Sequence, residues 1–86
     1  MQKVVLYSKE GCHLCEQALT KLQHLRVEHE FQLDIIEITN DKALFERYFL
    51  SIPVVELDGN IVFQASDMGS SQDFGKLETL FCQTLS

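Results

Sequence analysis

A pair of cysteines at the junction of a strand and a helix is the feature that most constrains this chain. Cys12 and Cys15 follow the apolar run at residues 4–7 and open a segment with helical periodicity. The backbone N–H groups at a helix N-terminus and the helix dipole stabilise an anion, so a thiolate at Cys12 is favoured. Cys15 lies within one helical turn, close enough to form a disulfide with Cys12 after a local adjustment. The spacing therefore predicts a reactive dithiol.

Strand and helix patterns alternate around this pair. Residues 3–7 and 31–38 carry runs of β-branched and apolar side chains, which are typical of strands. Residues 12–28 repeat apolar side chains at helical spacing, and Cys15 falls on that apolar stripe. We therefore expect a helix that buries Cys15 and leaves Cys12 exposed at its start, which is the asymmetry that an attacking and a resolving thiol require.

The second half of the chain predicts a helix, a hairpin and a last helix. Asn40-Asp41 is a cap for a helix that runs to about Phe49. An Asp-Gly-Asn sequence at 58–60 between two apolar runs indicates an antiparallel hairpin. Ser70-Ser71 offers a cap for the last helix, whose apolar residues are Phe74, Leu77, Leu80, Phe81 and Leu85.

The resulting order, β-α-β-α-β-β-α, predicts an α/β fold of the thioredoxin-like type. A right-handed β-α-β unit followed by a hairpin gives a four-stranded mixed sheet flanked by helices. A C-x-x-C pair beside such a unit is typical of a thioredoxin-like redox motif. The length of 86 residues predicts a single domain spanning 1–86.

Charge and hydropathy limit the classes of partner that we expect this protein to bind. The net charge of −6, with seven scattered Lys and Arg, disfavours binding to nucleic acid. No segment approaches the ~20 apolar residues of a membrane span, and residues 4–7 are too short a run for a signal-peptide core. We therefore expect a cytoplasmic protein that is a monomer, with no membrane contact. Three cysteines in a reducing compartment favour reactive rather than structural thiols.

With these features established, the chain resembles the glutaredoxins of the thioredoxin superfamily. The resemblance rests on Tyr-Ser-Lys-Glu-Gly-Cys-His-Leu-Cys at residues 7–15 and on Ser-Ile-Pro-Val-Val at residues 51–55. It covers nearly the whole chain and is closest to small glutaredoxin-like domain proteins with a Cys-His-Leu-Cys motif. It implies the glutaredoxin type of the thioredoxin-like fold.

The resemblance also implies roles for individual residues. Cys12 would be the nucleophile and Cys15 the resolving thiol. Lys9 would stabilise the thiolate or contact a carboxylate of glutathione. Ile52 would offer backbone groups to a thiol substrate, and Pro53 would be cis and face the dithiol.

The chain departs from the family at the glutathione site. Counting from Pro53, the Gly-Gly of glutaredoxins falls on Phe63 and Gln64. Glycines there let the γ-glutamyl end of glutathione approach the backbone, so we expect these two side chains to crowd it. Asp67 falls where the family has its second acidic residue, and we include it among the expected substrate-binding residues.

Some residues near the dithiol keep two interpretations. An imidazolium at His13 would stabilise the Cys12 thiolate and make the disulfide more oxidising, or His13 is a solvated side chain on the first turn. Thioredoxins use a buried acid beneath the dithiol to move protons. Asp34, Glu37 and Glu56 lie in or next to strands, but none can be assigned that role without knowing which face it occupies.

Three functions compete. The leading hypothesis is a thiol–disulfide oxidoreductase that reduces protein disulfides or glutathione mixed disulfides. It needs no metal or organic cofactor, and its electron donor is glutathione or a reductase. The first alternative is a thioredoxin-like binding or adaptor module without turnover. The second alternative is a protein that binds an iron–sulfur cluster between two chains with the help of glutathione. Two chains are needed because one C-x-x-C supplies only two of the four ligands that such a site requires.

Overall fold

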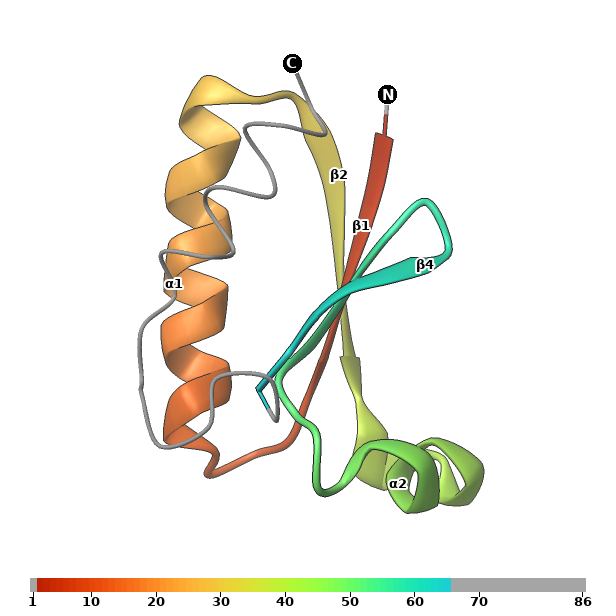
Figure 1. Cartoon of the computed structure of the whole chain (residues 1–86). Helices are drawn as coiled ribbons and strands as arrows, with labels where there is room; N and C mark the ends of the chain where they lie inside the picture. The colour runs from red at the N-terminus through yellow and green to blue at the C-terminus, as the bar shows by residue number, and fades with distance from the viewer. Residues whose placement is uncertain (1, 66–86) are drawn as a thin grey trace.

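The computed structural model describes residues 2–65, and its centre is a four-stranded sheet in the order β2-β1-β3-β4 (Figure 1). The strands are β1 (Gln2–Ser8), β2 (Phe31–Glu37), β3 (Val54–Leu57) and β4 (Asn60–Gln64). β1 runs parallel to β2 and antiparallel to β3, and β3 pairs antiparallel with β4. The predicted mixed sheet is confirmed.

Two α-helices and one turn of 3-10 helix connect the strands. Helix α1 (His13–Glu28) joins β1 to β2, and the 3-10 turn η1 (Ile38–Asn40) leads into α2 (Lys42–Tyr48). The predicted cap of α2 is confirmed at Asp41, whose Oδ1 accepts hydrogen bonds from the N–H groups of Ala43 at 2.9 Å and Leu44 at 3.2 Å. This cap satisfies two of the four N–H groups that a helix start leaves unpaired.

The two helices pack on opposite faces of the sheet. Successive side chains of a strand point to opposite faces, so Leu6 and Tyr7 of β1 face different neighbours. One cluster lies between α1 and the sheet, and its buried residues are Val4, Leu6, Ala18, Leu22, Leu25, Phe31, Val55, Leu57 and Phe63. The other lies under α2, with Ile38, Tyr48 and Val54 buried and Tyr7, Leu44, Phe45 and Ile52 packed against them.

The hairpin between β3 and β4 turns at Asp58 and Gly59, both with positive φ, at 51° and 88°. This pair of left-handed residues matches the right-handed twist of the strands, which is why an Asp-Gly sequence is typical of such turns. Asp58 also ties the turn to β1, since Lys3 N–H donates to its Oδ1 at 2.9 Å and its own N–H donates to the Lys3 carbonyl at 2.8 Å. A register shift between Val55 and Glu56 leaves Val62 as an extra residue in β4.

The fold is α/β and thioredoxin-like, as predicted, with strands and helices in the expected order as far as Ala65. The predicted last helix and its cap at Ser70-Ser71 lie outside the described residues. Within residues 2–65, no helix is long and apolar enough to cross a membrane.

Candidate active site

The dithiol begins where β1 ends. Gly11, with φ of 82°, lets the chain turn sharply after β1, and the N–H of Cys12 donates to the carbonyl of Lys9 at 3.2 Å. Cys12 is the N-cap of α1, with extended backbone angles. Its Sγ accepts a hydrogen bond from the backbone N–H of Cys15 at 3.2 Å. The sulfur therefore occupies the place that a capping side-chain oxygen takes in most helices.

Cys15 stands behind Cys12 in the first turn of α1. Its side chain is 3% exposed, whereas Cys12 is half-buried, so the predicted asymmetry is confirmed except that Cys12 is less exposed than expected. Burial raises the pKa of the Cys15 thiol to about 12, with further contributions from its hydrogen bond to Cys12 and from the negative charge of Glu37. Cys15 is therefore a protonated thiol at neutral pH.

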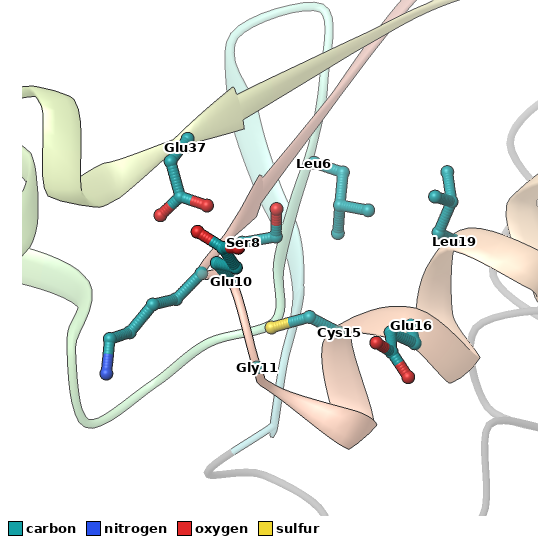
Figure 2. Close-up of a pocket in the computed structure, with 9 residues that line it drawn as sticks. Leu6, Ser8, Glu10, Gly11, Cys15, Glu16, Leu19 and Glu37 are labelled. Atoms are coloured by element: carbon teal, nitrogen blue, oxygen red, sulfur yellow. The ribbon is translucent and has the colours of Figure 1, made fainter.

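An open pocket adjoins Cys15 between α1 and the ends of β1 and β2 (Figure 2). The Cys15 sulfur points from α1 toward the loop after Ser8, while Glu37 enters from β2. The pocket has apolar walls from the core and polar groups at its mouth. Its lining residues are Leu6, Ser8, Lys9, Glu10, Gly11, Cys15, Glu16, Leu19 and Glu37.

The structure distinguishes Asp34, Glu37 and Glu56, the three acids that the sequence left unassigned, by the face of the sheet on which each lies. Asp34 lies 3.4 Å from the Nζ of Lys3, and Glu56 hydrogen-bonds Tyr7. Glu37 pairs in register with Ser8 and lines the pocket together with Cys15. Its carboxylate also accepts a hydrogen bond from the Thr39 hydroxyl at 2.8 Å. Glu37 is therefore the strand acid that lies beside the dithiol.

The segment before β3 reaches the same edge of the sheet. The peptide bond between Ile52 and Pro53 is cis, as the resemblance implies, and Pro53 is fully buried. Val54, the next residue, pairs with Tyr7 at the end of β1, which brings this segment next to the loop that carries Cys12. The N–H of Ile52 donates to the carbonyl of Tyr48 at 3.0 Å, so a backbone contact to substrate would have to come from the Ile52 carbonyl.

The other expected site residues are placed as follows. Lys9 is exposed and lines the pocket. His13 is 92% exposed, and its Nδ1 lies 3.8 Å from the Glu16 carboxylate on the first turn of α1. The imidazole is thus solvated, as the second interpretation expects, and a role of His13 in stabilising the Cys12 thiolate stays a prediction. Asp67 lies outside the described residues.

The expectation that Phe63 crowds a glutathione site is wrong. The Phe63 side chain is 2% exposed and belongs to the cluster between α1 and the sheet. It points into the core because Phe63 pairs with Val55, whose side chain faces α1. Gln64 is half-buried at the end of β4, opposite Val54. It follows Phe63 directly, so its side chain points to the opposite face of the sheet.

Residues 2–65 contain no group of three or more His, Cys, Asp or Glu placed to hold a metal ion. The chemistry available in this part of the chain is that of two adjacent thiols, one capping a helix and one buried behind it. Such a pair can exchange two electrons with a disulfide.

The arrangement of this sheet, with a cysteine pair at the start of α1 and a cis proline at the same edge, defines a thioredoxin-type redox module. Residues 3–80 match the family described as Glutaredoxin-like domain (DUF836). The chain belongs to this glutaredoxin-like family. No curated protein matches the sequence significantly.

Solved structures agree with this fold. The solution structure of protein Ne2328 from Nitrosomonas europaea is 26% identical, with a TM-score of 0.70, over 92% of this chain and 89% of that one. Protein XcR50 from X. campestris is also 26% identical, with a TM-score of 0.69, over 94% and 97% of the two chains. Oxidized glutaredoxin 2 from Chlamydomonas reinhardtii is 24% identical, with a TM-score of 0.55, over 95% and 81%.

Proposed function

We propose that this protein is a thiol–disulfide oxidoreductase that uses Cys12 as nucleophile and Cys15 as resolving thiol. The observation that carries the proposal is the hydrogen bond from the Cys15 N–H to Cys12 Sγ at 3.2 Å, with the buried Cys15 thiol directly behind it. The outer sulfur, Cys12 Sγ, is half-buried at the start of α1, while burial raises the pKa of the Cys15 thiol and keeps it protonated. The two thiols are therefore suited to different steps.

In the first step, the Cys12 thiolate attacks one sulfur of a substrate disulfide. A Cys12–substrate disulfide forms, and the other substrate sulfur leaves as a thiolate that takes a proton from solvent. In the second step, Cys15 loses its proton and attacks Cys12 Sγ, which releases the second substrate thiol. The substrate gains two electrons, and the protein is left with a Cys12–Cys15 disulfide.

Glu37 is the proton acceptor that we propose for the second step. It lines the same pocket as Cys15, and its negative charge already acts on that thiol. The proton would pass through a water molecule in the open pocket, as general bases often operate. Lys9 at the mouth of the pocket would attract the carboxylates of a thiol reductant.

The substrate that we propose is a disulfide-bearing protein, and the reductant is glutathione or a reductase. The Ile52 carbonyl and Pro53 directly precede Val54, which pairs with Tyr7 at the end of β1, so this segment would receive an extended segment of a partner next to the loop that carries Cys12. We further propose a single-domain, monomeric, cytoplasmic protein that works without a metal or organic cofactor, and Asp67 remains a proposed substrate contact.

A redox titration tests the function. In Cys82→Ser protein, Cys12 and Cys15 are the only cysteines that remain. Samples equilibrated in glutathione buffers of graded potential are alkylated and analysed by intact mass. We expect a two-electron transition from two alkylated thiols to none, centred between about −200 and −270 mV. Absence of any disulfide or glutathione adduct across the range would refute the oxidoreductase and leave the adaptor alternative.

The matched control is the same protein with Cys12→Ser added. It retains the buried thiol but lacks the nucleophile, so it should show one alkylation at every potential. A glutathione adduct on Cys12→Ser protein would place the reactive sulfur at Cys15 and contradict the assigned roles.

A further inference from the structure

Two different surfaces flank the dithiol, and their positions follow from the strand order. On the β2 side of β1, Glu37 pairs with Ser8 and lines the pocket beside Cys15. On the β3 side, Val54 pairs with Tyr7, so the segment that precedes Val54 borders the loop that carries the dithiol. A substrate chain that crosses Cys12 therefore meets one surface with one end and the other surface with its opposite end.

The surface on the β3 side is apolar. Leu50 is 79% exposed and Phe49 is 49% exposed, and both precede the half-buried Ile52 and the cis proline. The ring of Phe49 is held by stacking on Phe45, with ring centroids 5.5 Å apart. We call Phe49, Leu50 and Ile52 the apolar ledge. It presents large side chains to solvent in the segment that leads to Val54, the strand partner of Tyr7, and a partner's side chain would cover them there.

The surface on the β2 side is negatively charged. The pocket beside Cys15 is lined by the carboxylates of Glu10, Glu16 and Glu37 and by one cation, Lys9. The whole chain has a formal charge of −6, so its remaining charges add to this field. Glutathione disulfide carries an excess of carboxylates over ammonium groups and is repelled, whereas a basic side chain is attracted.

We propose that the substrate of this site is a polypeptide disulfide with an apolar side chain on one side of its reactive cystine and a basic side chain on the other. The inference rests on the proposed function and names its substrate class. The apolar side chain covers the apolar ledge, and the basic one lies against the pocket carboxylates. Glutathione disulfide offers neither feature and is a poor substrate.

Another exposed apolar side chain supplies a matched control. Val27 is 86% exposed in the last turn of α1. It lies fifteen residues after Cys12, or about 22 Å along the helix axis. Replacement of Val27 by Ser removes exposed apolar surface as Leu50→Ser does, but far from the dithiol.

The experiment compares four reagents on Cys82→Ser protein: a cystine-bridged peptide pair with Leu and Lys flanks, the same pair with Ser and Glu flanks, glutathione disulfide, and neutral 4,4′-dithiodipyridine. We expect the second-order rate constant for oxidation of the reduced protein by the Leu-Lys peptide to exceed the constants for the Ser-Glu peptide and for glutathione disulfide by about tenfold or more. Raising the ionic strength should reduce this preference, because salt screens the attraction between exposed charges.

Variants test the preference for an apolar flank and the preference for a basic flank separately. Leu50→Ser should lower the ratio of the Leu-Lys peptide rate to the 4,4′-dithiodipyridine rate about tenfold, and Val27→Ser should leave it unchanged. The Glu10→Gln, Glu16→Gln double variant should reduce the preference for Lys over Glu flanks and its salt dependence. Glu37 is kept because it also takes part in the proposed proton transfer.

The outcomes separate this inference from the proposed function. If the protein reduces 4,4′-dithiodipyridine with a Cys12–Cys15 disulfide as product but treats all peptides and glutathione disulfide alike, the substrate class is wrong and the dithiol function stands. If it does not react with 4,4′-dithiodipyridine, the dithiol function itself fails. If the wild type sediments as a dimer that Leu50→Ser converts to a monomer, the ledge binds a second copy, which overturns the proposal.

Discussion

Replacement of Glu37 by Gln separates two effects of this carboxylate that have opposite signs. As a charge, Glu37 raises the pKa of Cys15, so its removal would favour the thiolate and speed resolution of the mixed disulfide. As a proton acceptor, its removal would slow the same step. Gln is a suitable replacement because its amide oxygen can still accept the hydrogen bond from the Thr39 hydroxyl.

The size of the effect follows from the pKa of Cys15. A thiol with a pKa of about 12 has roughly 10⁻⁵ of its population as thiolate at pH 7, and one at its ordinary value of 9.0 has roughly 10⁻². The Cys12 contribution to this pKa is lost in the mixed disulfide, whereas burial and the Glu37 charge remain. With either value the free thiolate is a minor species, so an acceptor within the pocket should contribute about a hundredfold or more.

The assay follows 4-thiopyridone release by stopped flow after Cys82→Ser protein reacts with one equivalent of 4,4′-dithiodipyridine. The first equivalent reports attack by Cys12 and the second reports resolution by Cys15. We expect Glu37→Gln to slow only the second phase, about a hundredfold at pH 7, and to make its rate rise about tenfold per pH unit. Asp34→Asn, on the opposite face of the same strand, should change neither phase. A second phase that is unchanged or faster in Glu37→Gln would refute the assignment.

Two predictions concern stability. Burial raises the pKa of Tyr7 from 10.0 to about 12, with contributions from the hydrogen bond and charge of Glu56, and that of Cys15 from 9.0 to about 12. Both groups hold their protons more tightly in the folded chain, so Tm should be steady from pH 7 to about 9 and fall toward pH 11; a rising Tm would contradict this. Asp41→Ala removes the cap of α2 and should cost about 1 kcal/mol, or about 4–8 °C in Tm, while Asp41→Asn should cost little; equal losses would exclude capping as the cause.

The parts of the fold that depend on local periodicity could be predicted from the sequence. The apolar stripe of residues 12–28 predicts both the helix and the burial of Cys15, because helix geometry alone sets which residues share a face. The Asp-Gly pair predicts the hairpin because few residues accept positive φ at two successive positions. Only the family resemblance predicts the cis state of Pro53, since most bonds before proline are trans.

The parts that depend on how strands face their neighbours could not be predicted in the same way. Glu37 is on the same face of β2 as Phe31 and Leu33, which pack in the cluster with α1, because these positions are separated by even numbers of residues. The sequence does not predict that Phe63 points into the core, because counting from Pro53 gives a position but not a side-chain direction. The extra residue at Val62 shifts the alternation of side chains between the two faces of β4, and no sequence signal near Phe63 predicts that shift.

The sulfur that caps α1 is also the proposed nucleophile, so the stability of the first helical turn is linked to the redox potential of the proposed dithiol. In a chain that forms the Cys12–Cys15 disulfide, oxidation changes the bonding of the sulfur that accepts the Cys15 N–H, and with it the strength of this capping hydrogen bond. A capping interaction of about 1 kcal/mol corresponds to about 20 mV for a two-electron couple. Fraying of the first helical turn and the reduction potential of the proposed dithiol thus both depend on the free energy of this capping interaction. Mutations that stabilise or destabilise the first turn of α1, even without touching sulfur, would therefore shift the potential of the proposed dithiol by about 20 mV per kcal/mol.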